Sequence, residues 1–279
     1  TIKAADLSKA QMQVALKEYI SNLAATTAAK ERIESELKIA RTIQMSFLPK
    51  RFPPFPEKEE FDIFAALEPA KEVGGDLYDF FLVDDDHVFF SIGDVSGKGV
   101  PAALFMAVTK TLIKGIAGQS VFPSHALEQV NQELCKDNDS SMFVTVCCGI
   151  LNFKTGELLF SNAGHNLPVL LSAGGEVGWL NSPEGFLLGI MEDASYEILR
   201  LDLNPGDTLF LYTDGVTEAM NERKEFFSDA ALLKTLAACP GRDPEALVEC
   251  VFGAVKAFAG AEPQSDDITV LALRYRGRA

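Results

Sequence analysis

The sequence predicts an α+β fold with a layered, mainly antiparallel sheet core that follows one long N-terminal helix. Many short segments are rich in β-branched and aromatic residues and are bounded by Gly, Asn, Asp or Pro, as strands are. Thr155-Gly156 and Gly174-Gly175 predict hairpin turns, which join antiparallel strands. The predicted helices come in pairs and do not alternate strictly with strands, which favours α+β over α/β.

The first 50 residues predict a helix. From Met12 to Phe47, positions spaced alternately by four and three residues are mainly apolar, and the residues between them are mostly polar. This heptad pattern is typical of a two-stranded coiled coil, although Thr26, Lys30 and Gln44 interrupt it. A dimerising coiled coil and an amphipathic helix packed on its own domain are both open, and we favour the coiled coil.

A proline-rich segment, Phe52–Pro56, predicts the end of this helix because proline cannot continue a helix. We therefore expect a coiled-coil signalling or linker helix over residues 1–50 and a second domain over residues 51–279. The charge changes at the same place. The first 50 residues have eight basic and five acidic side chains, a net charge of +3, and the whole chain carries −15, which leaves −18 for the rest.

Strands and helices are expected in order along the second domain. The expected strands are Phe61–Leu67, Val88–Ile92, Phe143–Asn152, Glu157–Ala163, Pro168–Leu171, Glu176–Leu180, Tyr196–Leu203, Thr208–Thr213 and Asp267–Tyr275. The expected helices are Pro101–Ile116, Ser124–Lys136, Asp229–Ala238 and Pro244–Ala259. Proline is well tolerated at the first position of a helix, as at Pro101.

Composition disfavours several classes of protein. A charge of −15 disfavours a nucleic-acid binder, because such binders neutralise phosphates with Lys and Arg. No run approaches the roughly 18 to 20 apolar residues of a membrane span, and no signal peptide opens the chain. Five cysteines form no C-x-x-C pair, and the odd number fits a reducing compartment, so we expect a cytoplasmic location. Because helical periodicity begins near Thr1, we also expect a piece of a longer protein.

Aspartates recur at the ends of the predicted strands. Asp76 follows the first strand, Asp94 and Asp214 each end a strand, and Asp266-Asp267 begin the last one. Each alone is typical of a turn. Together at one rim they would repel one another and have raised pKa values unless cations neutralised them. Oxygen ligands without nearby His or Cys favour Mg²⁺ or Mn²⁺ over Zn²⁺, and two such ions could clamp a phosphoryl group.

Five motifs containing these residues occur in a familiar order. They are Glu72–Asp79, Gly93–Gly99, Asn162–Asn166, Thr213–Ala219 and Asp266–Thr269. With them the chain resembles the metal-dependent (type 2C, PPM) serine/threonine protein phosphatases, and within these the bacterial branch typified by the stage II sporulation protein E domain. The resemblance covers about residues 40 to 275. It implies a four-layer αββα sandwich of mainly antiparallel sheets, with two Mn²⁺ or Mg²⁺ ions where the sheets meet.

The resemblance also implies roles for individual residues. Asp94 would bridge both metal ions, and Val95 would offer its backbone carbonyl to one of them. Asp214 and Asp266 would be terminal metal ligands. The catalytic function of Asp94 and Asp214 would be exerted through a metal-activated bridging water, which attacks a phosphoserine or phosphothreonine phosphorus.

Other positions are less sharply defined by the resemblance. Asp76 would lie near the metals and act through water. Asp267 stands where many relatives have Asn, so the choice between it and Asp266 as a ligand is open, with Asp266 preferred. Lys98 either binds the substrate phosphate or stays solvated on a glycine turn. No residue matches the general acid of eukaryotic relatives, and we expect His165 to be a hydrogen-bonded structural residue.

The N-terminal segment from Leu16 to Met45 is similar to the helix that joins HAMP modules to such phosphatase domains. This similarity implies the cytoplasmic part of a bacterial inner-membrane sensor, which forms a homodimer through its N-terminal helix. The implied substrate is a phosphorylated anti-sigma-factor antagonist or a similar partner-switching protein. We expect the signal to shift the two helices that follow the Asp94 loop.

Two other functions are open at this point. One is a non-catalytic phosphoprotein-binding module with a degenerate phosphatase fold, and the other is a dimerisation scaffold. The presence of all the candidate metal carboxylates disfavours the first. A Mn²⁺-dependent phosphatase assay, repeated with Asp94→Asn, separates an enzyme from both.

Overall fold

The structure is a computed structural model that describes residues 2–119, 122–183 and 185–277. The chain divides into two compact units, Thr1–Ile43 and Gln44–Ala279. We call them the N-terminal unit and the C-terminal unit and describe each by itself.

The N-terminal unit is helical. Helix α1 (Ile2–Phe47) contains it and continues into the first residues of the C-terminal unit. Ion pairs at i,i+4 spacing, Lys30–Glu34 and Arg32–Glu36, support the helix. Most apolar positions predicted for a coiled-coil seam are solvent-exposed in this single chain, among them Leu16 at 56%, and Leu37 and Ala40 are partly exposed. The predicted helix is confirmed, and its pairing with a second copy stays a prediction.

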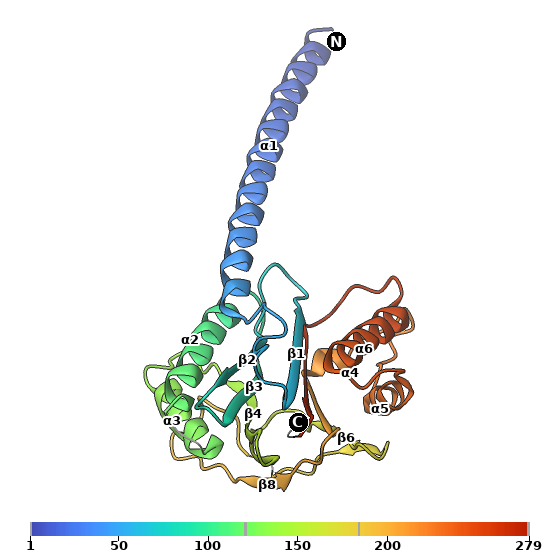
Figure 1. Ribbon diagram of the computed structural model, residues 1–279. Coiled ribbons are helices and arrows are strands. Elements are labelled where there is room, and N and C mark those ends of the chain that lie inside the picture. Colours follow the sequence, from blue (N-terminus) through green and yellow to red (C-terminus); the bar gives the residue numbers. More distant parts are fainter. Residues whose placement is uncertain (1, 120–121, 184, 278–279) are drawn as a thin grey trace. The chain divides into compact units, whose positions relative to one another are not determined.

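The C-terminal unit contains two five-stranded sheets (Figure 1). Sheet A has the order β1 (Phe61–Glu68), β10 (Ile268–Tyr275), β9 (Thr208–Tyr212), β6 (Val169–Leu171) and β7 (Val177–Trp179). Sheet B has the order β2 (Leu77–Leu82), β3 (His87–Val95), β4 (Val144–Asn152), β5 (Glu157–Ala163) and β8 (Leu199–Asp202). Every adjacent pair of strands is antiparallel, as the hairpin signals predict.

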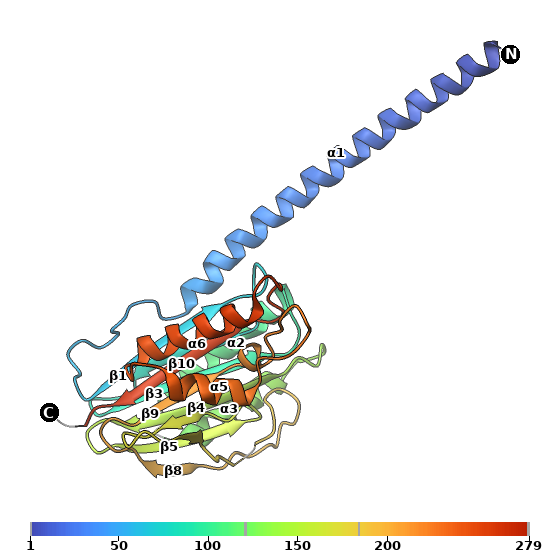
Figure 2. The ribbon, with the colours of Figure 1, turned by 90° about the vertical axis from the view of Figure 1, so that its right-hand side faces the viewer.

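Helices cover the outer face of each sheet. Helices α2 (Val100–Ala117) and α3 (Pro123–Cys135) pack on sheet B. Helices α4 (Asp214–Thr217), α5 (Asp229–Ala238) and α6 (Pro244–Ala259) lie on the side of sheet A. Figures 1 and 2 show the resulting order of layers, with the two sheets between the two groups of helices. The expected four-layer αββα sandwich is confirmed.

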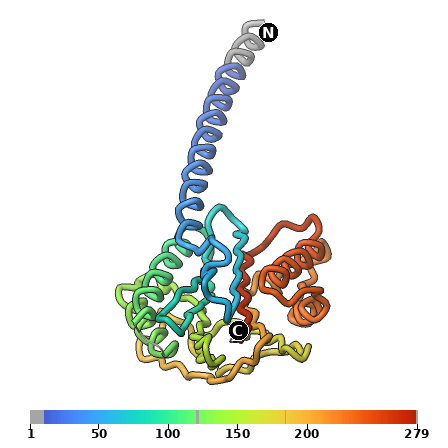
Figure 3. The backbone as a smooth tube through the Cα atoms, in the orientation of Figure 1, coloured from blue at the N-terminus to red at the C-terminus, as the bar shows by residue number. Residues whose placement is uncertain are grey.

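Strand alternation builds the core on both faces of a sheet. On β1, Phe61, Ile63 and Ala65 point into the apolar core between the sheets. The intervening residues Phe64 and Ala66 pack against the core beneath α5 and α6. Strands β1 and β10, near the two ends of this unit, lie side by side along their whole length (Figure 3). The first and last strands of this unit are therefore neighbours in sheet A, with β1 at its edge.

Two elements were not predicted. Strand β2 is buried on both faces over most of its length, and only its first three residues belong to the Glu72–Asp79 motif. Helix α4 is a single turn directly after β9, too short to show a helical period. Both elements lie at the rim where the aspartates gather.

The start of the C-terminal unit precedes the predicted boundary at Phe52–Pro56. Gln44 and Leu48, in and just after the last turn of α1, are buried at 6% and 3% exposure. The proline-rich segment is also packed, because the Phe52 and Phe55 rings contact Phe80 of β2. The end of α1 is therefore part of the sandwich, whereas the composition alone marked a break after it.

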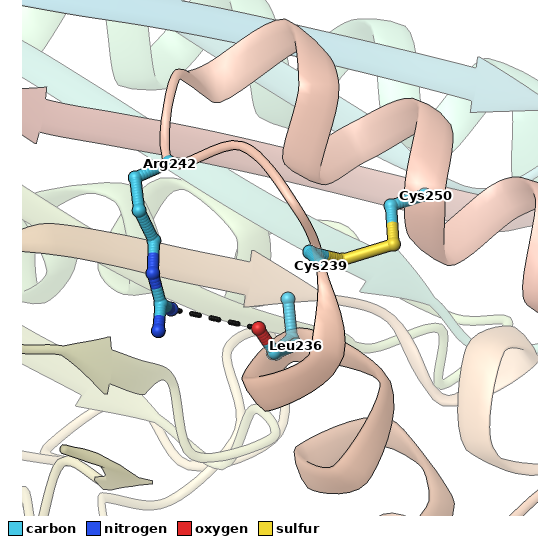
Figure 4. Close-up of a disulfide and its surroundings, with 4 residues drawn as sticks. All are labelled: Leu236, Cys239, Arg242 and Cys250. Atoms are coloured by element: carbon cyan, nitrogen blue, oxygen red, sulfur yellow. Dashed lines mark hydrogen bonds between the residues drawn. A yellow bond between two sulfur atoms is a disulfide. The ribbon is translucent and has the colours of Figure 1, made fainter. Parts of the chain in front are cut away.

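A disulfide joins the two outer helices on the side of sheet A. Cys239, just after α5, is bonded to Cys250 of α6 (Figure 4). In the same connection, the guanidinium of Arg242 donates a hydrogen bond to the Leu236 carbonyl. The cysteine spacing did not predict this bond. Cys135, Cys147 and Cys148 are free thiols.

Within the described ranges, helix α2 is long and apolar enough in composition to cross a membrane. Its buried residues include Met106 and Ile113, which pack in the core over sheet B. A core helix of a layered protein gives the same result. The finding therefore adds no membrane span to the fold.

Candidate metal centre

The five predicted aspartates come from strand ends of both sheets. Asp94 lies near the end of β3, and Asp76 directly precedes β2 in the same sheet. Asp214 begins α4 after β9, and Asp266-Asp267 directly precede β10. Asp94 interacts electrostatically with Asp214, Asp266 and Asp267, and Asp76 interacts with Asp94 and Asp267. The structure thus brings all five carboxylates to one rim.

Asp76 and Asp94 form the buried part of this rim. Asp76 is 3% exposed, and its Oδ2 accepts hydrogen bonds from Thr213 (2.8 Å) and Thr269 (2.5 Å). Burial raises the pKa of Asp76 well above its ordinary value, and the neighbouring Asp94 charge raises it further. Burial, followed by the charges of Asp214 and Asp266, raises the pKa of Asp94 to about 7. Both side chains therefore need a cation or a proton for electrical balance.

Asp266 and Asp267 are adjacent but have different surroundings. Asp267 Oδ1 accepts from the Ala70 N–H and its Oδ2 from the Gly75 N–H, both at 2.8 Å. A Cβ atom at Gly74 would lie only 1.8 Å from Asp267 Oδ2, so the loop can approach this closely only with glycine there. The side chain of Asp266 is 34% exposed and is not used to hold the loop. These contacts support Asp266 as the ligand and Asp267 as the residue that positions the loop.

Asp214 and the Val95 carbonyl lie at the same rim. Burial raises the pKa of Asp214, and the charges of Glu218 and Asp266 raise it further. The Val95 carbonyl lies so near Gly75 that a Cβ atom there would be 2.8 Å from its oxygen. The backbone oxygen predicted as a ligand is thus next to the loop that precedes Asp76.

Lys98 does not stand free on its glycine turn. Its Nζ donates hydrogen bonds to the Ser265 carbonyl and to Asp266 Oδ2, both at 2.8 Å. The ion pair joins the loop after β3 of sheet B to the segment before β10 of sheet A. Of the two predicted roles, a fully solvated lysine is therefore wrong, and binding of the substrate phosphate stays a prediction.

His165 is a buried link between the sheets. Its Nδ1 lies 2.9 Å from the Thr145 hydroxyl of β4, and its Nε2 lies 3.1 Å from the Tyr212 carbonyl of β9. Since a carbonyl only accepts, Nε2 carries the proton and Nδ1 accepts from Thr145. Burial lowers the pKa of His165 to about 4, so the ring is neutral at pH 7. These contacts agree with the expected structural role.

Sequence reasoning missed three residues that support the rim. Thr213 and Thr269 hold Asp76, and each precedes or follows a predicted aspartate by one or two positions. Gln44, read as an interruption of the heptad, pairs through its side-chain amide with the backbone of Gly74: its Nε2 donates to the carbonyl at 2.6 Å. A buried glutamine at the end of an otherwise exposed helix carries no sequence signal of its own.

The residues present fit a hard divalent cation. The donors are carboxylate and carbonyl oxygens, which Mg²⁺ and Mn²⁺ prefer. Burial and the neighbouring carboxylates raise the pKa values of Asp76 and Asp94, as expected where several carboxylates share one site. Among the described residues, no three His, Cys, Asp or Glu side chains already form a coordination set. The carboxylates therefore gather at one rim without closing around a single point.

Comparison with known proteins places these features in a family. The family model for stage II sporulation protein E (SpoIIE) matches residues 84–276. Protein IcfG of Synechocystis is 32% identical over 92% of this chain and 45% of its own length. Phosphoserine phosphatase RsbU of Bacillus subtilis is 29% identical over 88% of this chain and 72% of its own. The chain thus spans less than half of the length of IcfG.

A solved structure has the same architecture. The SiaA-PP2C domain of Pseudomonas aeruginosa superposes with a TM-score of 0.76 at 26% sequence identity. The match covers 89% of this chain and 99% of the SiaA domain. The similarity therefore extends over nearly the whole of that domain.

Proposed function

Because the chain belongs to the SpoIIE family and is a PP2C-type phosphatase domain, we propose that it is a signal-gated protein serine/threonine phosphatase. Its proposed substrate is a phosphorylated partner-switching protein of the anti-sigma-factor antagonist type. The convergence of Asp76, Asp94, Asp214 and Asp266 at one rim is the observation that carries the proposal. The relationship to RsbU, a phosphoserine phosphatase, supports the substrate class.

Two Mg²⁺ or Mn²⁺ ions are proposed at this rim. The residues that would hold them are Asp94, Asp214, Asp266 and the Val95 carbonyl. Asp76 would lie near the ions and act through water. When bound, such ions lower the pKa of water and offset the charge of a phosphoryl group. The chain's own part is to fix the carboxylates: Thr213 and Thr269 orient Asp76 by hydrogen bonds.

Phosphate binding and proton transfer are assigned differently. Lys98 is the cationic side chain that forms an ion pair at the rim in the described part of the chain, which supports it as a contact for the substrate phosphate. His165 is unsuited to protonating a leaving group, because it is buried and both ring nitrogens are engaged. A solvent proton is therefore the proposed source for the leaving serine or threonine.

Gating is proposed to reach the rim through the end of α1 and through α2. Gln44 binds the backbone of Gly74, and the next residue, Gly75, binds Asp267. Helix α2 begins directly after the Lys98 turn. Gln44→Ala is expected to change the Mn²⁺ concentration that gives half-maximal activity, whereas the exposed Gln13→Ala is not. Equal values for the two variants would contradict this route.

The remaining assignments concern the protein to which this chain belongs. Exposed apolar positions along α1 support a homodimer through that helix. We also propose that α1 is a HAMP-type linker and that the parent protein lies in the inner membrane. The part described by this chain would then be cytoplasmic. Nucleic acid is not a proposed partner, given the charge of −15.

The deciding experiment is hydrolysis of a phosphoserine protein and of a generic phosphoester with Mn²⁺. Asp94→Asn is expected to lower the rate by about a thousandfold or more, since it removes the central carboxylate. Asp85→Asn, in an exposed turn of the same sheet, is the matched control and is expected to be unchanged. Full activity of Asp94→Asn would overturn the metal assignment. Absence of hydrolysis by the unaltered chain would favour a phosphoprotein-binding module.

A further inference from the structure

We propose that Lys98 serves as the counter-ion of the candidate metal site when no metal is bound. Its ammonium pairs with the Asp266 carboxylate and is displaced when a divalent cation binds that carboxylate. Once displaced, the same ammonium is free to meet the substrate phosphate. This inference rests on the proposed function, since it describes how that site exchanges one cation for another. It assigns to Lys98 a regulatory role in metal binding.

The first step is the contact itself. Lys98 Nζ lies 2.8 Å from Asp266 Oδ2, the carboxylate that the surroundings favour as a metal ligand over Asp267. A divalent cation and an ammonium compete for the same lone pairs of that carboxylate. Because Asp266 Oδ1 already accepts from the Asp267 N–H at 2.9 Å, a cation that binds Asp266 has to share or displace the Lys98 contact at Oδ2.

The second step is the number of donors. An ammonium has three N–H groups, and two of them point to Ser265 and Asp266. One remains for an anion that approaches the rim. The Lys98 side chain is 44% exposed, so such an anion can reach it from solvent.

The third step is the conformation of the turn that carries Lys98. Gly97 and Gly99 both have positive φ values, 82° and 81°, which L side chains rarely adopt. A Cβ atom at either position would meet no atom within 4 Å, so glycine is needed there for conformation and not for space. The turn thus has a defined conformation, and movement of the ammonium comes from the flexible four-carbon stem of Lys98.

The fourth step is the charge of the rim. Among the described residues, the Lys98–Asp266 pair is the ion pair that involves a candidate metal ligand. The positive charge of Lys98 also acts on Asp214. A single tethered charge can therefore stabilise the empty rim and oppose metal entry, because its attraction to the carboxylates is lost on displacement.

The test is Mn²⁺ binding to the full chain, measured by isothermal titration calorimetry and free of any assay of turnover. Lys98→Gln is expected to bind Mn²⁺ about fivefold more tightly, the effect of losing a partly exposed ion pair. The metal-free variant is expected to unfold at a lower temperature than the metal-free parent chain. Lys98→Arg keeps the charge and is expected to bind Mn²⁺ no more tightly than the parent chain.

Lys136→Gln is the matched control, because Lys136 forms a similarly exposed pair with Glu133 on α3, away from the rim. Unchanged or weaker Mn²⁺ binding by Lys98→Gln would overturn the inference. Two further outcomes separate it from the proposed function. Tighter binding without hydrolysis by the parent chain would retain the inference and overturn the phosphatase proposal. If the parent chain hydrolysed the substrate but it and Lys98→Gln bound Mn²⁺ equally tightly, the phosphatase proposal would be retained and the inference overturned.

Discussion

The two helical layers of the C-terminal unit cover equivalent sheets but are fastened differently. Helices α5 and α6 are joined by the Cys239–Cys250 disulfide, and α6 begins with a side-chain cap, in which Asp243 accepts from the Ala246 N–H. Helix α2 begins at Gly99 without a side-chain cap and is tied to sheet B by the buried ion pair of Lys110 with Asp79. One layer is thus fixed by a covalent bond and the other by contacts that can be released.

The difference bears on function because the releasable layer adjoins Asp94. Helix α2 follows the Asp94–Gly99 segment directly, whereas the disulfide joins Cys239, just after α5, to Cys250 within α6. The outer face of α2 also exposes Val100, Leu104 and Val108, one helical turn apart. On the proposed gating route, a signal would therefore reach the rim through the layer over sheet B. Three of the four predictions below test this comparison, and the other concerns the link between the sheets.

The largest effect is expected from breaking the buried ion pair. Lys110→Met leaves the Asp79 carboxylate buried without its partner, because Lys110 and Asp79 side chains are only 8% and 2% exposed. We expect a loss of about 3 to 5 kcal/mol in the free energy of unfolding, measured with urea. Lys110→Met combined with Asp79→Leu should regain most of it. Lys114→Met, an exposed lysine on the same helix, is the control, and an equal loss there would contradict the role of the pair.

The second effect concerns the covalent layer. Replacing Cys239 and Cys250 by serine, or reducing the chain, is expected to lower the free energy of unfolding by about 3 kcal/mol, because the bond closes a short loop. Mn²⁺ affinity is expected to stay the same, since the bond joins α5 to α6 and neither helix carries a proposed metal ligand. Cys135→Ser serves as the control. If the denaturant midpoint of unfolding stayed the same after reduction, the disulfide would not contribute to the stability of the chain.

The third effect is a dependence on pH that belongs to neither layer. His165 links the sheets, and its pKa of about 4 in the folded chain lies below the ordinary 6.5. As the pH falls from 6.5, the unfolded chain takes up a proton that the folded chain refuses, so stability is lost towards pH 4. Relative to His165→Gln, the parent chain should lose about 1.5 kcal/mol between pH 6.5 and about pH 5.

Urea unfolding at several pH values in the presence of a chelator measures this difference. The raised pKa values of Asp76 and Asp94 act in the opposite direction, because those groups bind protons in the folded chain. Their contribution is common to the parent chain and the variant and cancels in the comparison. If the free energy of unfolding varied with pH in the same way for both proteins, His165 would not be a buried histidine with a lowered pKa.

The smallest effect is expected from the cap of α6. Asp243→Ala removes the acceptor for the Ala246 N–H and should cost about 1 kcal/mol of unfolding free energy. Asp193→Ala, in an exposed turn, is the control. A cap loss as large as that of Lys110→Met would reverse the ranking of the two layers.

The sequence predicted most elements of the fold because their signals are local. Helices α5 and α6 have the predicted bounds, and nine strands were expected close to their observed places. Strand β2 was not predicted because it is buried on both faces and so shows no alternation of apolar and polar residues. The disulfide was not predicted because the spacing of Cys239 and Cys250 matches no known cysteine motif.

The candidate site was predictable only in its charged residues. Asp94 and Asp214 stand out beside glycine at strand ends, and the structure gathers them as expected. The supports of the site are uncharged or distant: Gln44 lies 30 residues before its partner Gly74, and Lys98 lies 167 residues before Ser265. Such long-range pairings arise from the packing of two sheets, which no local pattern records.

The position of β10 has a consequence for biosynthesis. This strand is the last in the chain, yet it lies between β1 and β9 in sheet A and directly follows Asp266-Asp267. Sheet A therefore stays open between β1 and β9 until residues 268–275 have been synthesised. Up to that point the nascent chain has neither a joined sheet A nor the complete set of candidate metal carboxylates.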